Sequence, residues 1–132
     1  MLTGTCLCGA CTWRFTTAPP RATACDCSAC RRYGAIWIYG HKGETTFVEG
    51  PHRAFIRSDD PEPSLSFDTC ERCGNLLAWT SLGKGGGPLR QALNLRLADD
   101  PAAVAAIPVY HHEGDRAFGN GTTRGTVADI WF

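Results

Sequence analysis

The sequence contains 132 residues, of which 43% are hydrophobic and 20% are charged, and its 13 basic residues balance 13 acidic ones. A chain of this length is typical of one domain, so we expect a single domain over residues 1–132. A net charge of zero provides no field that attracts a phosphate backbone, which argues against a nucleic-acid-binding protein. The sequence shows no long apolar run and no signal peptide, so we expect a soluble cytoplasmic protein that does not enter a membrane.

The apolar pattern along the chain predicts strands. Cys11, Trp13 and Phe15 alternate with Thr12 and Arg14, and this period of two is typical of a half-buried strand. Similar runs, separated by turns rich in proline and glycine, predict further strands over residues 35–39, 45–49, 53–57, 65–67, 76–80, 91–97 and 109–112. The sequence therefore predicts an all-β fold.

Helix is expected in only two places. A short turn should follow Cys27 and run through Arg32, and a second helix should cover residues 100–106. In the second, Asp99 or Asp100 can cap the helix while Pro101 occupies its first position, where a missing N–H costs nothing.

The last residues of the chain, 126–132, end on the aromatic pair Trp131 and Phe132. Exposed aromatic side chains need either a groove on their own domain or a partner that covers them. We expect this segment to dock on its own domain rather than to form a dimer seam. Both a monomer and a homodimer remain open.

Eight cysteines in three tight clusters are the most informative feature of the sequence: Cys6, Cys8 and Cys11; Cys25, Cys27 and Cys30; Cys70 and Cys73. Thiolates around one tetrahedral zinc lie about 3.8 Å apart, because Zn–S distances are about 2.3 Å, and spacings of one or two residues allow this. Cysteines so close in sequence rarely bridge each other. Without a route to an oxidising compartment, the pattern favours metal binding over disulfides.

The eight thiols can be divided among metal ions in more than one way. Two closed four-thiolate sites are one possibility, and a four-thiolate site plus a three-thiolate site with one unused cysteine is another. Spacing favours the second, because residues 25–30 hold a compact tridentate set, whereas Cys6/Cys8 and Cys70/Cys73 are bidentate pairs that would meet across the fold. Seven thiolates and two Zn²⁺ ions would bring the net charge to about −3.

Several stretches together resemble the glutathione-dependent formaldehyde-activating enzyme family, also called the CENP-V/GFA domain. They are GTCLCGA at 4–10, CDCSACRR at 25–32, FDTCERCGNL at 67–76, LADDP at 97–101 and PVYH at 108–111. The resemblance implies an Mss4-like β-tent of zinc-linked antiparallel sheets. It also implies a structural zinc on Cys6, Cys8, Cys70 and Cys73, and a catalytic zinc on Cys25, Cys27 and Cys30. The activity that it implies is a carbon–sulfur lyase reaction, the joining of glutathione and formaldehyde into S-hydroxymethylglutathione.

The sequence departs from the family pattern at two positions. Asp26 stands where the family usually has histidine, and its carboxylate would lie beside an already anionic site. We therefore expect weak turnover with glutathione and a preference for a neutral or cationic thiol. Cys11 stands where members often have valine, which leaves either a small buried residue or an alternative metal ligand.

An open three-thiolate zinc site favours thiol chemistry over hydrolysis. Three thiolates donate so much charge that the zinc is a weak Lewis acid, but a thiol that binds beside them is deprotonated at neutral pH. The partner we expect is therefore a small thiol such as glutathione. Candidate helpers are Arg31 and Arg32, which could bind a substrate carboxylate, and three histidines that could relay protons: His52, His111 and His112.

Other interpretations remain open from the sequence. Trp37, Tyr39 and Trp79 are most simply core aromatics, although one of them could line a pocket. A zinc-stabilised, non-catalytic binding module of Mss4-like fold is the alternative to an enzyme. An iron–sulfur or rubredoxin-like carrier fits the paired cysteines at 70 and 73 but not the three-thiol cluster.

Overall fold

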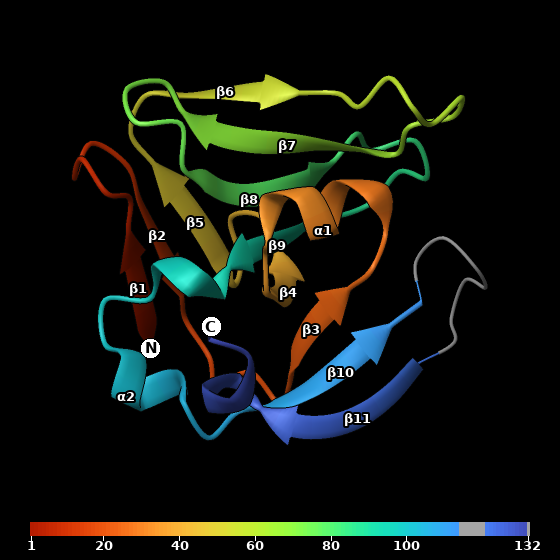
Figure 1. The fold of residues 1–132 in the computed structure, drawn as a ribbon. Coiled ribbons are helices and arrows are strands. Elements are labelled where there is room, and N and C mark those ends of the chain that lie inside the picture. Colours follow the sequence, from red (N-terminus) through yellow and green to blue (C-terminus); the bar gives the residue numbers. More distant parts are fainter. Residues whose placement is uncertain (114–120, 132) are drawn as a thin grey trace.

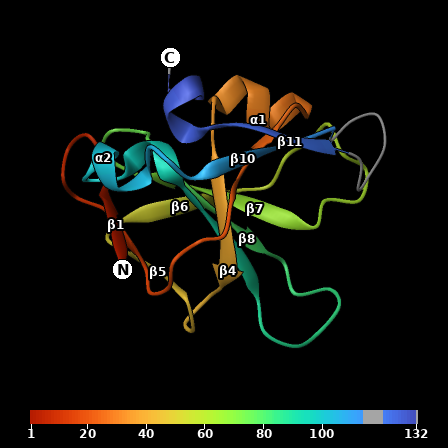
Figure 2. The same cartoon turned by 90° about the horizontal axis from the view of Figure 1, so that it is seen from below.

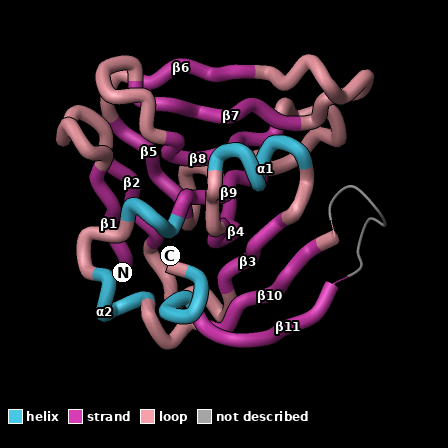
Figure 3. Tube along the Cα trace, viewed as in Figure 1, coloured by secondary structure: helices cyan, strands magenta, loops and turns pink. Residues whose placement is uncertain are grey.

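The computed structural model describes residues 1–113 and 121–131, and it consists of two β-sheets with a few short helices (Figures 1 and 3). The smaller sheet has three antiparallel strands in the order β1-β2-β5. Their bounds are Leu2–Thr5 for β1, Thr12–Phe15 for β2 and Thr46–Glu49 for β5. The all-β prediction is confirmed.

The larger sheet has eight strands in the order β11-β10-β3-β4-β9-β8-β7-β6. In chain order these are β3 (Ala22–Cys25), β4 (Trp37–His41), β6 (His52–Phe55), β7 (Leu65–Cys70), β8 (Leu76–Ser81), β9 (Arg90–Asn94), β10 (Pro108–His112) and β11 (Gly121–Thr126). Neighbouring strands are antiparallel except β3 and β10, which run parallel. The antiparallel sheets that the family resemblance implies are therefore present, with one parallel pair of strands.

Four short helical segments complete the described structure: α1 (Ser28–Tyr33), the 3₁₀ turn η1 (Leu95–Leu97), α2 (Pro101–Val104) and the 3₁₀ turn η2 (Val127–Ile130). Both expected helices are present. The side chain of Asp100 accepts a hydrogen bond from the Ala102 amide at 3.0 Å, and Pro101 begins the helix. This helix ends at Val104, two residues before the expected end.

The strands that the sequence did not predict carry little apolar alternation. β1 (LTGT) and β11 (GTTRGT) are mostly small and polar, and β3 (ATAC) is built from small residues. The expected strand over 91–97 ends instead at Asn94. The Asn94 side chain accepts a hydrogen bond from the Arg96 amide at 3.3 Å and thereby caps the 3₁₀ turn that follows.

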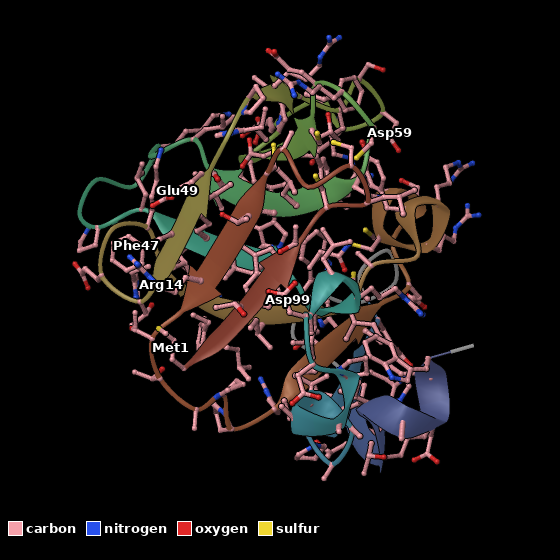
Figure 4. The ribbon with its side chains drawn as sticks, turned by 90° about the vertical axis from the view of Figure 1, so that its left-hand side faces the viewer. Met1, Arg14, Phe47, Glu49, Asp59 and Asp99 are labelled. Carbon is pink, nitrogen blue, oxygen red and sulfur yellow. The ribbon has the colours of Figure 1, made fainter. Side chains whose placement is uncertain are left out.

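The main core lies on the inner face of the small sheet. Trp13 and Phe15 are almost fully buried there, as their alternation predicted. Gly4 pairs with Trp13 across the sheet, and a side chain on Gly4 would collide with the indole ring. On the outer face of the sheet, the Arg14 guanidinium lies 4.3 Å from the centre of the Phe47 ring (Figure 4).

The C-terminal segment docks on its own chain, as expected. Val127 is fully buried, and Trp131 packs against the main core. Arg96 fixes the segment by donating to the carbonyls of Trp131 at 2.7 Å and of Ile130 at 2.9 Å. The C-terminal turn lies on the same side of the molecule as α1 (Figure 2). Phe132 lies outside the described residues.

Candidate metal sites and the adjoining cavity

The first candidate metal site joins the two sheets. Cys6 and Cys8 lie in the turn after β1, Cys70 ends β7, and Cys73 lies in the turn before β8. Their four Sγ atoms all lie within 4.8 Å of one another. The Cys6–Cys8 distance is 3.6 Å and the Cys8–Cys70 distance is 3.7 Å, close to the spacing of about 3.8 Å that tetrahedral zinc requires. The two cysteine pairs therefore meet as the sequence predicted.

Backbone amides around this cluster favour thiolates over thiols. The Cys11 amide donates to Cys6 Sγ at 3.2 Å, and the Arg72 amide donates to Cys70 Sγ at 3.4 Å. A hydrogen bond from the Cys73 backbone, together with that of Arg72, lowers the pKa of Cys70 to about 6. Gly74, with φ of 76°, turns the backbone back so that its amide donates to the Cys70 carbonyl at 3.0 Å. The donor set fits a soft metal ion.

Cys11 stays outside this ligand set and is fully buried in the core. Its Sγ donates to the Pro51 carbonyl at 3.2 Å, and burial raises its pKa to about 12. The interpretation of Cys11 as a small buried residue therefore agrees with the structure.

The second candidate metal site is local to one turn of the chain. Cys25 ends β3, Cys27 is the N-cap of α1, and Cys30 lies inside that helix. Their Sγ atoms lie within 4.8 Å of one another. The Cys30 amide donates to Cys27 Sγ at 3.4 Å, and the Trp37 indole N–H donates to Cys30 Sγ at 3.3 Å. Hydrogen bonds from the Cys25 and Cys30 thiols lower the pKa of Cys27.

These three thiols face a cavity of about 550 Å³. The cavity lies along one face of the large sheet, beside the turn that carries the three cysteines. Its lining consists of the three cysteines with Arg21, Thr23, Trp37, Tyr39, Arg57, Ser64, Leu65, Phe67, Trp79, Ser81, Arg90, Tyr110 and His112. All three aromatic residues that the sequence treated as core side chains therefore also line the cavity.

Strand register explains why these residues share one face. Residues that pair directly across neighbouring strands point to the same side of a sheet. Thr23 pairs with Trp37, and Trp79 pairs with both Phe67 and Ala92. Tyr39 pairs with Ala92 as well, so side chains from strands far apart in the sequence converge on one surface.

The cavity carries positive charge. Three arginines line it, and no aspartate or glutamate is among the lining residues of the described chain. The Arg21 guanidinium lies 4.2 Å from the Tyr110 ring centre, and that of Arg90 lies 5.5 Å from Tyr39 and 5.8 Å from Trp79. The aromatic rings hold these cations at the wall of the cavity.

The expected arginine helpers do not reach this cavity. Arg31 and Arg32 are exposed on α1, and Arg32 donates to the Ser28 carbonyl at 2.9 Å instead. Asp26 is also exposed and is not a lining residue. The structure instead brings in Arg57 and Arg90, which lie far from the cysteines in the sequence.

The three expected histidines separate in the structure. His112 lines the cavity. His111 Nε2 lies 3.2 Å from the Arg124 carbonyl, and the exposed His52 donates from Nδ1 to the Gly50 carbonyl at 2.8 Å. The cavity arginines had no signal in the sequence, because even the strand that follows Arg21, β3 (Ala22–Cys25), was not predicted.

The comparisons with known proteins agree with this structure. No curated protein matched the chain. A crystal structure of a Rhodobacter sphaeroides protein from a structural genomics programme has the same fold, with a TM-score of 0.59 and 22% identity over 81% of this chain and 98% of that one. The family described as glutathione-dependent formaldehyde-activating enzyme matches residues 1–109. The chain therefore belongs to the glutathione-dependent formaldehyde-activating enzyme family.

Proposed function

We propose that this chain is a zinc-dependent carbon–sulfur lyase or synthase that acts on the adduct of a small thiol and a carbonyl compound. The proposed activity is similar to that of an S-hydroxymethylglutathione synthase. The observation that carries this proposal is a cluster of three thiols that lines a cationic cavity of about 550 Å³. Three thiolates leave a tetrahedral metal with a fourth position for a ligand from the cavity.

Both thiol clusters fit zinc. Cys6, Cys8, Cys70 and Cys73 would hold a structural ion, since their four sulfurs have tetrahedral spacing. Cys25, Cys27 and Cys30 would hold a second ion. When bound at the second cluster, zinc lowers the pKa of a substrate thiol so that the thiolate forms at neutral pH.

The cavity charge favours an acidic thiol such as glutathione. Arg21 and Arg90 are held on aromatic rings and present planar guanidinium groups suited to carboxylates. Asp26 lies outside the cavity lining, so its carboxylate is not part of the surface that a thiol substrate would contact. We therefore propose that glutathione is turned over despite the charge of Asp26.

In the cavity, His112 could carry the proton of the adduct hydroxyl, and Tyr39 could hydrogen-bond to that hydroxyl. Burial raises the pKa of Tyr39 to about 12, although a hydrogen bond from Thr23 opposes the shift. The Tyr39 phenol therefore keeps its proton at neutral pH and acts as a hydrogen-bond donor.

The decisive experiment measures hemithioacetal formation from glutathione and formaldehyde, relative to the uncatalysed rate. Protein purified without chelator should contain about two zinc ions per chain and accelerate the reaction. Cys27→Ala should remain folded, lose one zinc ion and return the rate to the uncatalysed value. Cys11→Ala is the matched control, because Cys11 lies outside both clusters, and it should keep both ions and the rate.

The same measurements separate the enzyme from a binding module. If the wild-type protein does not accelerate the reaction and a protein side chain completes the second zinc site, the enzyme proposal is wrong. A zinc-stabilised, non-catalytic module would then be the better interpretation.

A further inference from the structure

Arg57 occupies an unusual position beside the three-thiol cluster. It lies in the segment between β6 and β7, and its side chain is 18% exposed. Its Nε donates to Asp59 Oδ1 at 2.7 Å, and its Nη2 donates to Asp59 Oδ2 at 3.0 Å. This paired contact fixes the plane of the guanidinium group.

A third residue ties this pair to the cysteine turn. Ser28, the first residue of α1, accepts a hydrogen bond from Arg57 Nη2 and donates to Asp59 Oδ2. Ser28 directly follows Cys27, so the segment that carries Arg57 is fastened to the three-thiol turn. Asp59 lies on the side of the molecule where α1 lies (Figure 4).

The guanidinium is directed toward the thiols and not only toward its partners. Arg57 lines the cavity together with Cys27. The Arg57 side chain also interacts with Cys27 itself, by charge and by a side-chain hydrogen bond. Within the described residues, Nη1 makes no hydrogen bond to an oxygen atom. Nη1 carries two N–H groups, so one is left for a ligand in the cavity when the other is used by Cys27.

We propose that Arg57 is a catalytic residue that donates a hydrogen bond to the carbonyl oxygen of the substrate, and that Asp59 and Ser28 are its positioning residues. This inference rests on the proposed carbon–sulfur chemistry. Fixed donors aimed at an oxygen where negative charge develops are among the largest contributions to catalysis.

The step is balanced without an oxidant or reductant. The thiolate sulfur gives its electron pair to the carbonyl carbon, the C–S bond forms, and the C=O π electrons move onto the oxygen. The thiol releases its proton to His112 or to solvent, and Arg57 stabilises the oxyanion until the oxygen takes that proton up. In the lyase direction the hydroxyl loses its proton, the C=O bond reforms and the C–S bond breaks.

The test compares Arg57→Lys and Arg57→Gln with the wild-type zinc protein, using glutathione and formaldehyde. Both variants should lower kcat about 100-fold, as the loss of one oxyanion donor does. Lysine keeps the charge but lacks the planar fork that Asp59 holds. The KM for the thiol and the zinc content after dialysis should stay unchanged. Arg53→Gln is the matched control, because Arg53 is an exposed arginine on the preceding strand, and it should keep the wild-type rate.

The outcomes separate this inference from the proposed function. Wild-type turnover with full activity in Arg57→Lys would show that only the charge matters and would overturn the inference alone. Zinc loss in Arg57→Gln would assign Arg57 to metal retention and also overturn it. If the wild-type protein shows no turnover, the proposed reaction and this inference both fail.

A double-variant comparison tests the positioning role of Asp59. Asp59→Asn should lower kcat, but it should add nothing to Arg57→Gln, because Asp59 acts through Arg57. Independent, additive losses would contradict the positioning role. Unchanged kcat in Asp59→Asn with reduced thermal stability would show that the ion pair is only structural.

Discussion

At the scale of single residues, similar side chains have different roles because of their neighbours. Cys6 and Cys11 belong to the same cluster in the sequence, yet only Cys6 joins a four-thiol group. Cys11 is fully buried and donates to the Pro51 carbonyl. Its raised pKa of about 12 reflects burial, which keeps the thiol neutral.

We predict that Cys11→Ala lowers the free energy of unfolding by about 1 kcal/mol, the cost of a small buried deletion. The zinc content should stay at the wild-type value. Urea denaturation measures the first quantity and elemental analysis the second. Loss of one zinc ion per chain would instead show that Cys11 is a ligand.

At the scale of elements, a polar network inside the large sheet joins three neighbouring strands. Asp68 on β7 is 5% exposed and accepts a hydrogen bond from Thr80 on β8 at 2.6 Å. Thr80 in turn accepts from Gln91 on β9 at 2.9 Å, and Ser66 donates to Asp68 at 3.3 Å. Burial nevertheless raises the pKa of Asp68, because hydrogen bonds only partly replace lost hydration.

This pKa direction predicts a pH dependence of stability. A carboxyl group whose pKa is raised on folding binds more protons in the native state, so stability falls as pH rises above its unfolded pKa of about 4. Asp68→Asn removes this titration. The free energy of unfolding of the wild type should therefore fall relative to the variant as the pH rises above about 4, until the folded pKa of Asp68 is passed.

Urea denaturation at several pH values checks this prediction. Titration of the metal ligands is common to both proteins and cancels in the difference between them. The difference in the free energy of unfolding between the wild type and Asp68→Asn could instead be constant with pH or change in the opposite direction. Either result would show that folding does not raise the pKa of Asp68.

At the scale of the whole molecule, the two thiol clusters connect segments that lie at very different distances along the sequence. The four-thiol cluster brings the turn after β1 together with the end of β7, and the Leu7 amide also donates to Asn75 across it at 2.7 Å. A metal at that position closes a long loop and links the two sheets. The cluster at residues 25–30 closes only one turn.

We therefore predict that Cys70→Ala unfolds or aggregates the protein, whereas Cys27→Ala leaves it folded. Structural zinc contributes folding free energy on the order of 10 kcal/mol in zinc peptides, and only the four-thiol site couples distant segments. Thermal denaturation followed by circular dichroism compares the two variants. Equal losses of Tm would contradict this division of roles.

No helix in residues 1–113 and 121–131 is long and apolar enough to cross a membrane.

The charge of the cavity and the charge of the whole chain differ. The chain has a formal net charge of zero, yet the cavity beside the three thiols is lined by three arginines and by no carboxylate within the described residues. Overall composition therefore said nothing about which substrates the cavity favours.

The sequence by itself determined the local chemistry, because cysteine spacings of one or two residues bring sulfurs together within a single turn. This local geometry located Cys25, Cys27 and Cys30, and the period of two located most strands. Edge strands and strands of small residues were not predicted. Hydrogen bonds to neighbouring strands hold them in place, and their sequences show no apolar alternation.

Only the tertiary structure decided which charged side chains meet these thiols. Arg21, Arg57 and Arg90 are separated by more than thirty residues from one to the next, and none has a local signature. The strand order places β3 and β9 on either side of β4, and the segment after β6 folds back onto α1 through Ser28. Arg31 and Arg32 directly follow Cys30 in the sequence, yet both are exposed on α1. Cavity composition is set by long-range strand pairing, which depends on the packing of the whole chain and not on the spacing within any one segment.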